Sequence, residues 1–245
     1  MNRHSPLYSV RSAETEDDLR AVQGLRYRVF VEEMGATGEG VDHERKLECD
    51  GFDAHARHLM LFDRADPAAE KVVGTYRMLT PEGAEAAGGY YSGGEYDLSP
   101  ILRDGRRVLE LGRSCLDPAH RGGFALPALF EALERVAREE RIDLVIGVAS
   151  FPGTDAARLA APLSLLRARH LAPLPLRVRA TGPDAMAMPE IAEEEIDRVA
   201  AMSAVPALIK AYLRRGALVG EGAYVDRQFN CTDICLILPI GEVAP

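Results

Sequence analysis

The sequence contains no tryptophan and only four cysteines among 245 residues, and it has no apolar run of the length that a membrane helix needs. Such a helix needs about 18 consecutive apolar residues. The cysteines form no Cys-x-x-Cys pair, so the spacings typical of zinc sites and dithiol redox motifs are absent. The first ten residues, MNRHSPLYSV, also lack the apolar core of a signal peptide. We therefore expect a cytoplasmic protein with reduced thiols and no structural metal.

Positive charge is also scarce, because 29 lysines and arginines face 38 aspartates and glutamates for a net charge of −9. This balance argues against nucleic acid as a partner. The arginines gather in two stretches, 103–121 and 167–179. An acidic protein with a local basic patch can still dock an acidic partner, although a normally mixed surface explains the same pattern.

Apolar periodicity predicts alternating strands and helices, which is typical of an α/β fold. The expected strands are 7–10, 58–62, 71–79, 108–116, 143–149, 218–225 and 234–238, and the expected helices are 15–30, 124–140, 155–169 and 205–213. Pro162 predicts a break or kink inside one of these helices. We find no repeat and no interdomain linker, so we expect a single domain over residues 1–245, with a mixed central sheet flanked by helices.

The first helix and the segment after it carry polar residues that invite a functional interpretation. Thr15 and Asp18 form a capping-box pattern, and Arg26 and Phe30 lie four residues apart on one helix face. Between 35 and 56 the periodicity disappears, and a loop of this length is usually functional or disordered. Because it runs directly into a strand, we expect an ordered loop. Its Asp50 and Asp53 are either site residues or turn residues.

A strand, a glycine-rich turn and a helix follow one another over 107–133. The strand contains Glu110 and Arg113, which face opposite sides of a regular strand unless a bulge intervenes. They form either a structural pair or a site in which Glu110 acts as a general base. The turn Arg121-Gly122-Gly123 leads into a helix N-terminus, a place that favours anions.

Taken together, these motifs resemble the GNAT N-acyltransferases. The closest resemblance is to the branch shared by ornithine N-acyltransferases of lipid synthesis and N-acyl homoserine lactone synthases. The matching motifs are LRYRVFVEE with Arg26 and Phe30, ECDGFD with Asp50 and Asp53, GTYRML with Arg77, and ELGR with Glu110 and Arg113. The segment 207–238 resembles the C-terminal signature of the ornithine acyltransferases.

The resemblance implies an enzyme that transfers a 3-hydroxy fatty acyl group from acyl carrier protein to the α-amine of ornithine. The donor is a 4′-phosphopantetheine thioester, and no permanently bound cofactor is implied. Glu110 would be the catalytic base. The acceptor side would comprise Arg26, Phe30, Asp50, Asp53, Arg77 and Arg113, and the pantetheine phosphate would bind Arg121, Gly122 and Gly123.

Two departures from the family patterns bear on the donor and the acceptor. The glycines at Arg121-Gly122-Gly123 come earlier than in the general GNAT turn, which favours the single phosphate of a carrier protein over coenzyme A. The absence of tryptophan favours the lipid branch over lactone synthesis. Glutamine as acceptor, a lactone synthase using S-adenosylmethionine, and a non-catalytic acyl-binding protein stay open as alternatives. An amphipathic product would also permit weak contact with the inner face of the membrane. The segment 205–215 could lie on such a surface, although ordinary core packing of its helix explains the same pattern.

Overall fold

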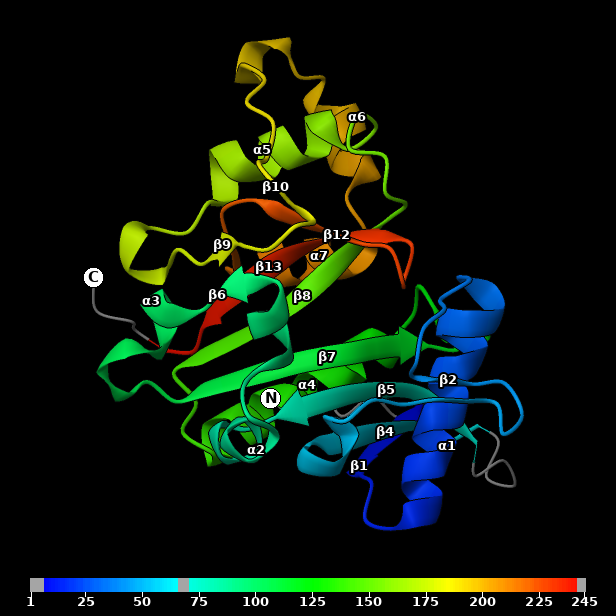
Figure 1. Ribbon diagram of the computed structural model, residues 1–245. Helices are drawn as coiled ribbons and strands as arrows, with labels where there is room; N and C mark the ends of the chain where they lie inside the picture. Colours follow the sequence, from blue (N-terminus) through cyan, green and yellow to red (C-terminus); the bar gives the residue numbers. More distant parts are fainter. Residues whose placement is uncertain (1–6, 66–70, 242–245) are drawn as a thin grey trace. The chain divides into compact units, whose positions relative to one another are not determined.

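Strand β7 (Val108–Leu116) belongs to both of the two compact units into which the chain divides in the computed structural model (Figure 1). The structure describes residues 7–65 and 71–241. The first unit consists of the described residues up to Gly88 together with Leu111–Arg141. The second consists of Gly89–Glu110 and the described residues from Ile142 onward. A single domain over residues 1–245 stays a prediction.

In the first unit, β1 (Tyr8–Ser12), β4 (Arg57–Asp63) and β5 (Val72–Leu79) form an antiparallel sheet, and β7 follows β5 in the strand order. The register between β4 and β5 shifts at Leu61/Phe62, where Phe62 pairs with Val72 and Leu61 with Gly74. This bulge lets Val72 share a face with Arg77, while Tyr76 points to the opposite face. The expected strands 58–62 and 71–79 are confirmed. Part of the turn between them, 66–70, lies outside the described residues.

Helices cover the two faces of this first sheet. Helix α1 (Glu16–Arg26) begins with the expected capping box of Thr15 and Asp18 and continues as a π-helix, η1 (Tyr27–Glu33). Its apolar side packs in a cluster of Val22, Leu25, Val29, Met60, Val72 and Cys115. On the other face, α4 (Ala125–Glu139) places the ring of Phe130 6.4 Å from that of Tyr76.

In the second unit, β8 (Leu144–Pro152) lies between the first half of β7, to which it is parallel, and β13 (Cys231–Pro239), to which it is antiparallel. The sheet continues through β12 (Ala223–Asp226) and β10 (Ala185–Met186), and β11 (Leu218–Val219) also pairs with β13. Its buried core includes Tyr96, Ile101, Val108, Ile146, Val178 and Ile237. The parallel and antiparallel pairings confirm the expected mixed sheet.

The helices of the second unit differ in detail from the sequence-based expectations. Helix α5 (Ala160–His170) begins later than expected, and Pro162 lies in its first turn, where a missing N–H costs nothing. The predicted break is therefore wrong. Helix α6 (Arg198–Ala204) was not expected, and α7 (Ala207–Leu213) buries Ile209, Ala211 and Tyr212. The apolar side of α7 therefore packs inside the unit.

Short elements complete the fold. Within the expected loop 35–56, β2 (Val41–Asp42) and β3 (Leu47–Glu48) form a small hairpin. The segment is therefore ordered, as expected, and contains regular structure. The others are α2 (Pro81–Ala87), β6 (Tyr96–Asp97), α3 (Ser99–Leu102), β9 (Arg179–Ala180), and the 3₁₀ turns η2 (Asp53–His55), η3 (Tyr91–Gly94), η4 (Arg103–Gly105), η5 (Pro118–His120), η6 (Leu174–Leu176) and η7 (Glu193–Glu195). Over the part of the chain that the structure describes, none of the helices combines the length and apolar character of a membrane span.

Candidate active site

A buried network of three arginines and three carboxylates fixes the segment 36–56 to the first unit. The arginines come from α1, β5 and β7, and the carboxylates all come from the segment 48–53. The members are Arg26, Arg77, Arg113, Glu48, Asp50 and Asp53. The structure thus brings together five of the six residues that the sequence assigned to the acceptor side.

Arg26 lies at the centre of this network and is fully buried. Its Nη1 lies 2.8 Å from Asp53 Oδ1, and its Nε donates to Glu48 Oε2. Asp53 Oδ2 accepts a further bond from the amide of Gln23 at 3.0 Å. Because Arg26 is the last residue of α1, these bonds attach the end of that helix to the segment 48–53.

Arg77 and Arg113 extend the network to the sheet. Arg77 Nη1 lies 2.5 Å from Asp50 Oδ1 and 3.1 Å from Asp53 Oδ1, with its guanidinium 5.5 Å from the ring centre of Phe52. Arg113 donates from Nε to Glu48 Oε1 at 3.1 Å and from Nη2 to Asp50 Oδ2 at 2.8 Å. Arg113 has a φ of +50°, a rare conformation for a non-glycine residue within a strand. This local irregularity directs its side chain to the loop.

The arginines of the network lower the pKa of its two aspartates. Burial alone would raise the pKa of Asp53, but Arg26 and Arg77 outweigh burial and lower that pKa to about 2. The pKa of Asp50 is also lowered, because Arg77 and Arg113 outweigh its partial burial. For Arg26, burial opposes the charged form, yet Glu48 and Asp53 raise its pKa. The three cations and three anions therefore compensate one another.

Two residues differ from the sequence-based assignment of this network. Glu48 is buried between Arg26 and Arg113 and was not assigned to the site. Its place two residues before Asp50 was the available signal, since alternate residues of an extended segment share a side. Phe30 has an uncharged side chain, which packs against the apolar cluster beneath α1.

Glu110 lies in the second unit, on the first half of β7, and is buried. Its Oε2 accepts the backbone N–H of Tyr91 and its Oε1 that of Ser92, both at 2.7 Å. The hydroxyl of Tyr90 donates to Val108 O at 2.7 Å, so the segment 90–92 is tied to this strand twice. These two bonds orient the carboxylate.

The glycine turn before α4 leaves open space beside the helix N-terminus, but Arg121 in this turn is already paired. Gly122 has a φ of +79°, and among the described residues none beyond the adjacent ones places an atom within 4 Å of a Cβ at Gly122 or Gly123. No side chain of the described residues caps the N-terminus of α4, whose first turn contains no acid. Arg121 pairs with Glu33, with Nη1–Oε1 at 2.6 Å and Nη2–Oε2 at 2.7 Å.

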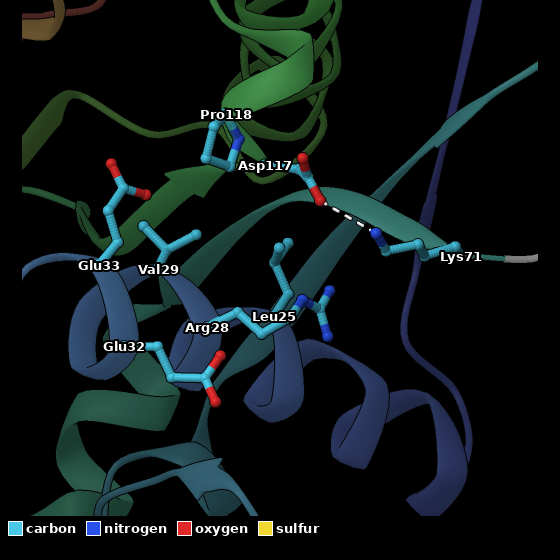
Figure 2. A pocket seen from close by; sticks show the side chains of 8 residues that line it. All are labelled: Leu25, Arg28, Val29, Glu32, Glu33, Lys71, Asp117 and Pro118. Atoms are coloured by element: carbon cyan, nitrogen blue, oxygen red, sulfur yellow. Dashed lines mark hydrogen bonds and ion pairs between the residues drawn. The ribbon is translucent and has the colours of Figure 1, made fainter.

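A surface pocket of about 290 Å³ adjoins this turn (Figure 2). Leu25 and Val29 give it an apolar floor, and Figure 2 shows Lys71 bonded to Asp117 along one side, at 3.1 Å. The remaining lining residues are Arg28, Glu32, Glu33 and Pro118. Glu33 therefore belongs both to the pocket wall and to the ion pair with Arg121.

Among the described residues, one group has side chains of the types that bind metals: Asp226, Cys231 and Asp233, whose ligand atoms lie within 4.8 Å of one another. Its own contacts already occupy these side chains. The Cys231 thiol donates to Asp233 at 3.2 Å. Burial raises the pKa of that thiol, and the negative charge of Asp233 raises it further. Asp226 accepts two backbone N–H groups of the following turn. A protonated thiol is a poor metal ligand.

Comparison with known proteins places this geometry in a family. A family model described as an acetyltransferase (GNAT) domain matches residues 25–131. The L-ornithine N(alpha)-acyltransferase of Rhodobacter capsulatus is 48% identical over 233 residues, which is 94% of this chain and 89% of that protein. The one from Brucella abortus is 39% identical over 239 residues, or 96% of this chain and 85% of that protein.

Solved structures agree on the fold. The CoA-dependent acyl-homoserine lactone synthase BjaI, solved with SAM and isopentyl-CoA, superposes with a TM-score of 0.53 at 13% sequence identity, covering 95% of this chain and 83% of that one. The GNAT-like fold expected from the motifs is therefore confirmed. With near-full-length similarity to its curated relatives, the chain belongs to the L-ornithine N(alpha)-acyltransferase family, an acyltransferase family on the GNAT fold.

Proposed function

We propose that this acyltransferase moves a 3-hydroxy fatty acyl group from the phosphopantetheine of acyl carrier protein to the α-amine of ornithine. The product is a lyso-ornithine lipid. The observation that carries the proposal is the 48% identity, over 94% of the chain, to an L-ornithine N(alpha)-acyltransferase. The carrier protein as donor is supported by the glycine turn, which offers a small anion site rather than a long cradle for a nucleotide.

Glu110 is the residue to which we assign the proton transfer. The carboxylate takes a proton from the ornithine ammonium, directly or through one water, and the resulting amine attacks the thioester carbonyl. The N–C bond forms, the C–S bond breaks, and a second proton leaves the nitrogen as the thiolate leaves and is protonated. The two backbone N–H groups that hold Glu110 support this role, because they fix the orientation of its carboxylate.

On the acceptor side, we assign direct contact with ornithine to Asp50 and Arg113. These are the members of the ion network whose side chains reach solvent, with exposures of 19% and 11%. Asp50 would meet an ammonium group and Arg113 the carboxylate of the amino acid. The buried Arg26, Asp53 and Arg77 hold these two residues in place, and Phe30 packs beneath the helix that carries Arg26.

On the donor side, Arg121 and the backbone N–H groups of Gly122 and Gly123 bind the single phosphate of the pantetheine arm. The uncapped N-terminus of α4 adds its positive end to this site. The same proposal places the enzyme in the cytoplasm, where an acylated carrier is at hand, with weak contact at the inner membrane face through its amphipathic product. No resident cofactor or metal takes part in the proposed steps.

The test is an assay of thiol release from 3-hydroxyacyl carrier protein with ornithine, glutamine and S-adenosylmethionine as separate acceptors. Each product is identified by its mass. We expect turnover with ornithine and a product one 3-hydroxyacyl group heavier than ornithine. A parallel reaction with 3-hydroxyacyl-CoA tests the donor and should be slower. Turnover only with glutamine, or release of a lactone, would overturn the acceptor assignment, and binding of the acylated carrier without turnover would overturn catalysis.

A further inference from the structure

The ion pair between Arg121 and Glu33 occupies the part of Arg121 that a phosphate would need. The end of the guanidinium, formed by Nη1 and Nη2, faces both oxygens of Glu33. Its side, formed by Nε and Nη2, donates to the carbonyl oxygen of Leu116 at 3.2 and 3.1 Å. A guanidinium binds a phosphate bidentately through one of these two pairs of N–H groups. Both pairs are therefore in use.

The two contacts differ in how readily they can be exchanged. Leu116 O belongs to the backbone at the end of β7 and cannot turn away without moving the strand. Glu33 is the last residue of η1, and its side chain and that of Arg121 are exposed by 38% and 42%. An ion pair exposed to this degree contributes little to stability, because water screens it. Glu33 is thus the ligand that a phosphate can replace.

There is room on both sides for this exchange. Figure 2 shows Glu33 on the wall of the surface pocket, which has a volume of about 290 Å³ and can take its side chain after release. Next to Arg121, the positions of a Cβ at Gly122 and Gly123 meet no atom within 4 Å. A phosphate at Arg121 would also gain the N-terminus of α4, which Glu33 does not cap.

We propose that Glu33 is a built-in competitor of the donor phosphate: its carboxylate holds the Nη1/Nη2 fork of Arg121 until the phosphopantetheine phosphate displaces it. Glu33 thereby sets the affinity of the enzyme for phosphorylated pantetheine, for both the acylated donor and the released carrier. This inference rests on the donor site assigned above to Arg121, Gly122 and Gly123. Glu33 is a positioning residue here, since it acts through Arg121 and never touches the reacting atoms.

The experiment compares the affinities of 4′-phosphopantetheine and pantetheine, measured by NMR titration of the full-length protein. The dissociation constant of pantetheine divided by that of 4′-phosphopantetheine isolates the contribution of the phosphate to binding. We expect a ratio above one for the wild type, and we expect Glu33→Gln to increase it by about two- to fivefold, the range of an exposed ion pair. Arg121→Gln should lower the ratio towards one, because only the backbone N–H groups of Gly122 and Gly123 and the N-terminus of α4 then hold the phosphate. Glu32→Gln is the matched control, because Glu32 lines the same pocket but pairs with Lys46 at 3.7 Å.

Each other outcome has a distinct meaning. A ratio that falls in Glu33→Gln overturns the inference, because Glu33 would then orient Arg121 for the phosphate. A ratio unchanged in Glu33→Gln but lowered in Arg121→Gln also overturns the inference, while leaving the donor site intact. A wild-type ratio of one, unaffected by Arg121→Gln, refutes the donor site itself and the competition with it. Thermal unfolding of each variant verifies that these exposed substitutions leave the fold unchanged.

Discussion

Arg77 Nη1 lies 2.5 Å from Asp50 Oδ1, although 27 residues separate them in the chain. One residue belongs to the central strand β5, and the other belongs to the segment that follows the β2–β3 hairpin. This pair shows how the segment 36–56 is held, because the segment is bound by charges that the sheet and α1 supply. The chemistry assigned to the acceptor side therefore depends on a buried ion network.

Removal of one cation should reveal how strongly this network holds the fold. Arg26→Leu removes one of the two arginines that pair with Glu48 and with Asp53, so two arginines face three carboxylates. Because the network is buried, we expect a loss of about 3–5 kcal/mol in the free energy of unfolding. Urea unfolding monitored by circular dichroism measures the change. Arg20→Leu on the exposed side of the same helix breaks two surface pairs and should cost at most about 1 kcal/mol. Equal losses in the two variants would contradict the structural role of the network.

The sequence predicted the elements better than the contacts between them. Thr15 and Asp18 act locally, so the start of α1 could be predicted, and the strands around Arg77 and Glu110 followed from apolar patterns. Glu48 shares a side with Asp50 in an extended segment, but its partners lie 22 and 65 residues away, and the local pattern does not identify them. Local periodicity carries no information about such distances.

Two backbone irregularities also lay beyond sequence reasoning. The π-helix from Tyr27 to Glu33 keeps an apolar side that resembles an ordinary helix, so a period of 3.6 does not reveal it. The positive φ of Arg113 costs energy, and the bonds to Glu48 and Asp50 help to offset it. Both features direct charged side chains, and both follow from tertiary contacts.

Acid should weaken the fold in a pH range set by Asp53. Its pKa is about 2 in the folded protein against about 3.9 in an unfolded chain. Because the folded pKa is the lower one, the stabilisation is complete above about pH 4 and disappears as the pH falls through 2. The difference corresponds to about 2.6 kcal/mol. Unfolding free energies measured from pH 5 to pH 2 should show this decline in the wild type and a shallower one in Asp53→Asn, and parallel curves would argue against it.

A glycine in the β2–β3 hairpin should prove essential for placing Glu48. A Cβ at Gly40 would lie 2.3 Å from the carbonyl oxygen of Cys49, whose N–H bonds to Gly40 O at 2.8 Å. Gly40→Ala should therefore displace Cys49 and the adjacent Glu48, with a loss of about 1–3 kcal/mol and reduced acyl transfer. Gly51→Ala in the same segment meets no atom within 4 Å and serves as the control. Comparable losses in both variants would mean that general loop flexibility, not this close approach, is responsible.

A kinetic experiment tests whether Asp50, which shares Arg77 with the buried Asp53, contacts the acceptor. If Asp50 contacts the acceptor, Asp50→Asn raises the KM for ornithine by about 10-fold or more, since a bond to a charged group is lost. The KM for the acyl donor should stay constant. Asp42→Asn removes an exposed charge from the same segment and should change neither constant. A change confined to kcat, with both KM values intact, would count against contact between Asp50 and ornithine.

Glu110 presents the sharpest test of catalysis, because its structural and chemical roles can be measured apart. Glu110→Gln keeps the shape of the side chain but turns an amide donor towards either Tyr91 N or Ser92 N, both of which are donors. We expect a loss of about 1–3 kcal/mol in stability from this conflict. Loss of a general base should lower kcat by about 10²–10⁴-fold. It should also remove from the pH profile of kcat the change caused by ionisation of that base. Ser92→Pro removes one of the two N–H groups without changing the acid, so its effect on kcat measures orientation alone. If Glu110→Gln reduces kcat no more than Ser92→Pro does, Glu110 supports the segment 90–92 and another group accepts the proton.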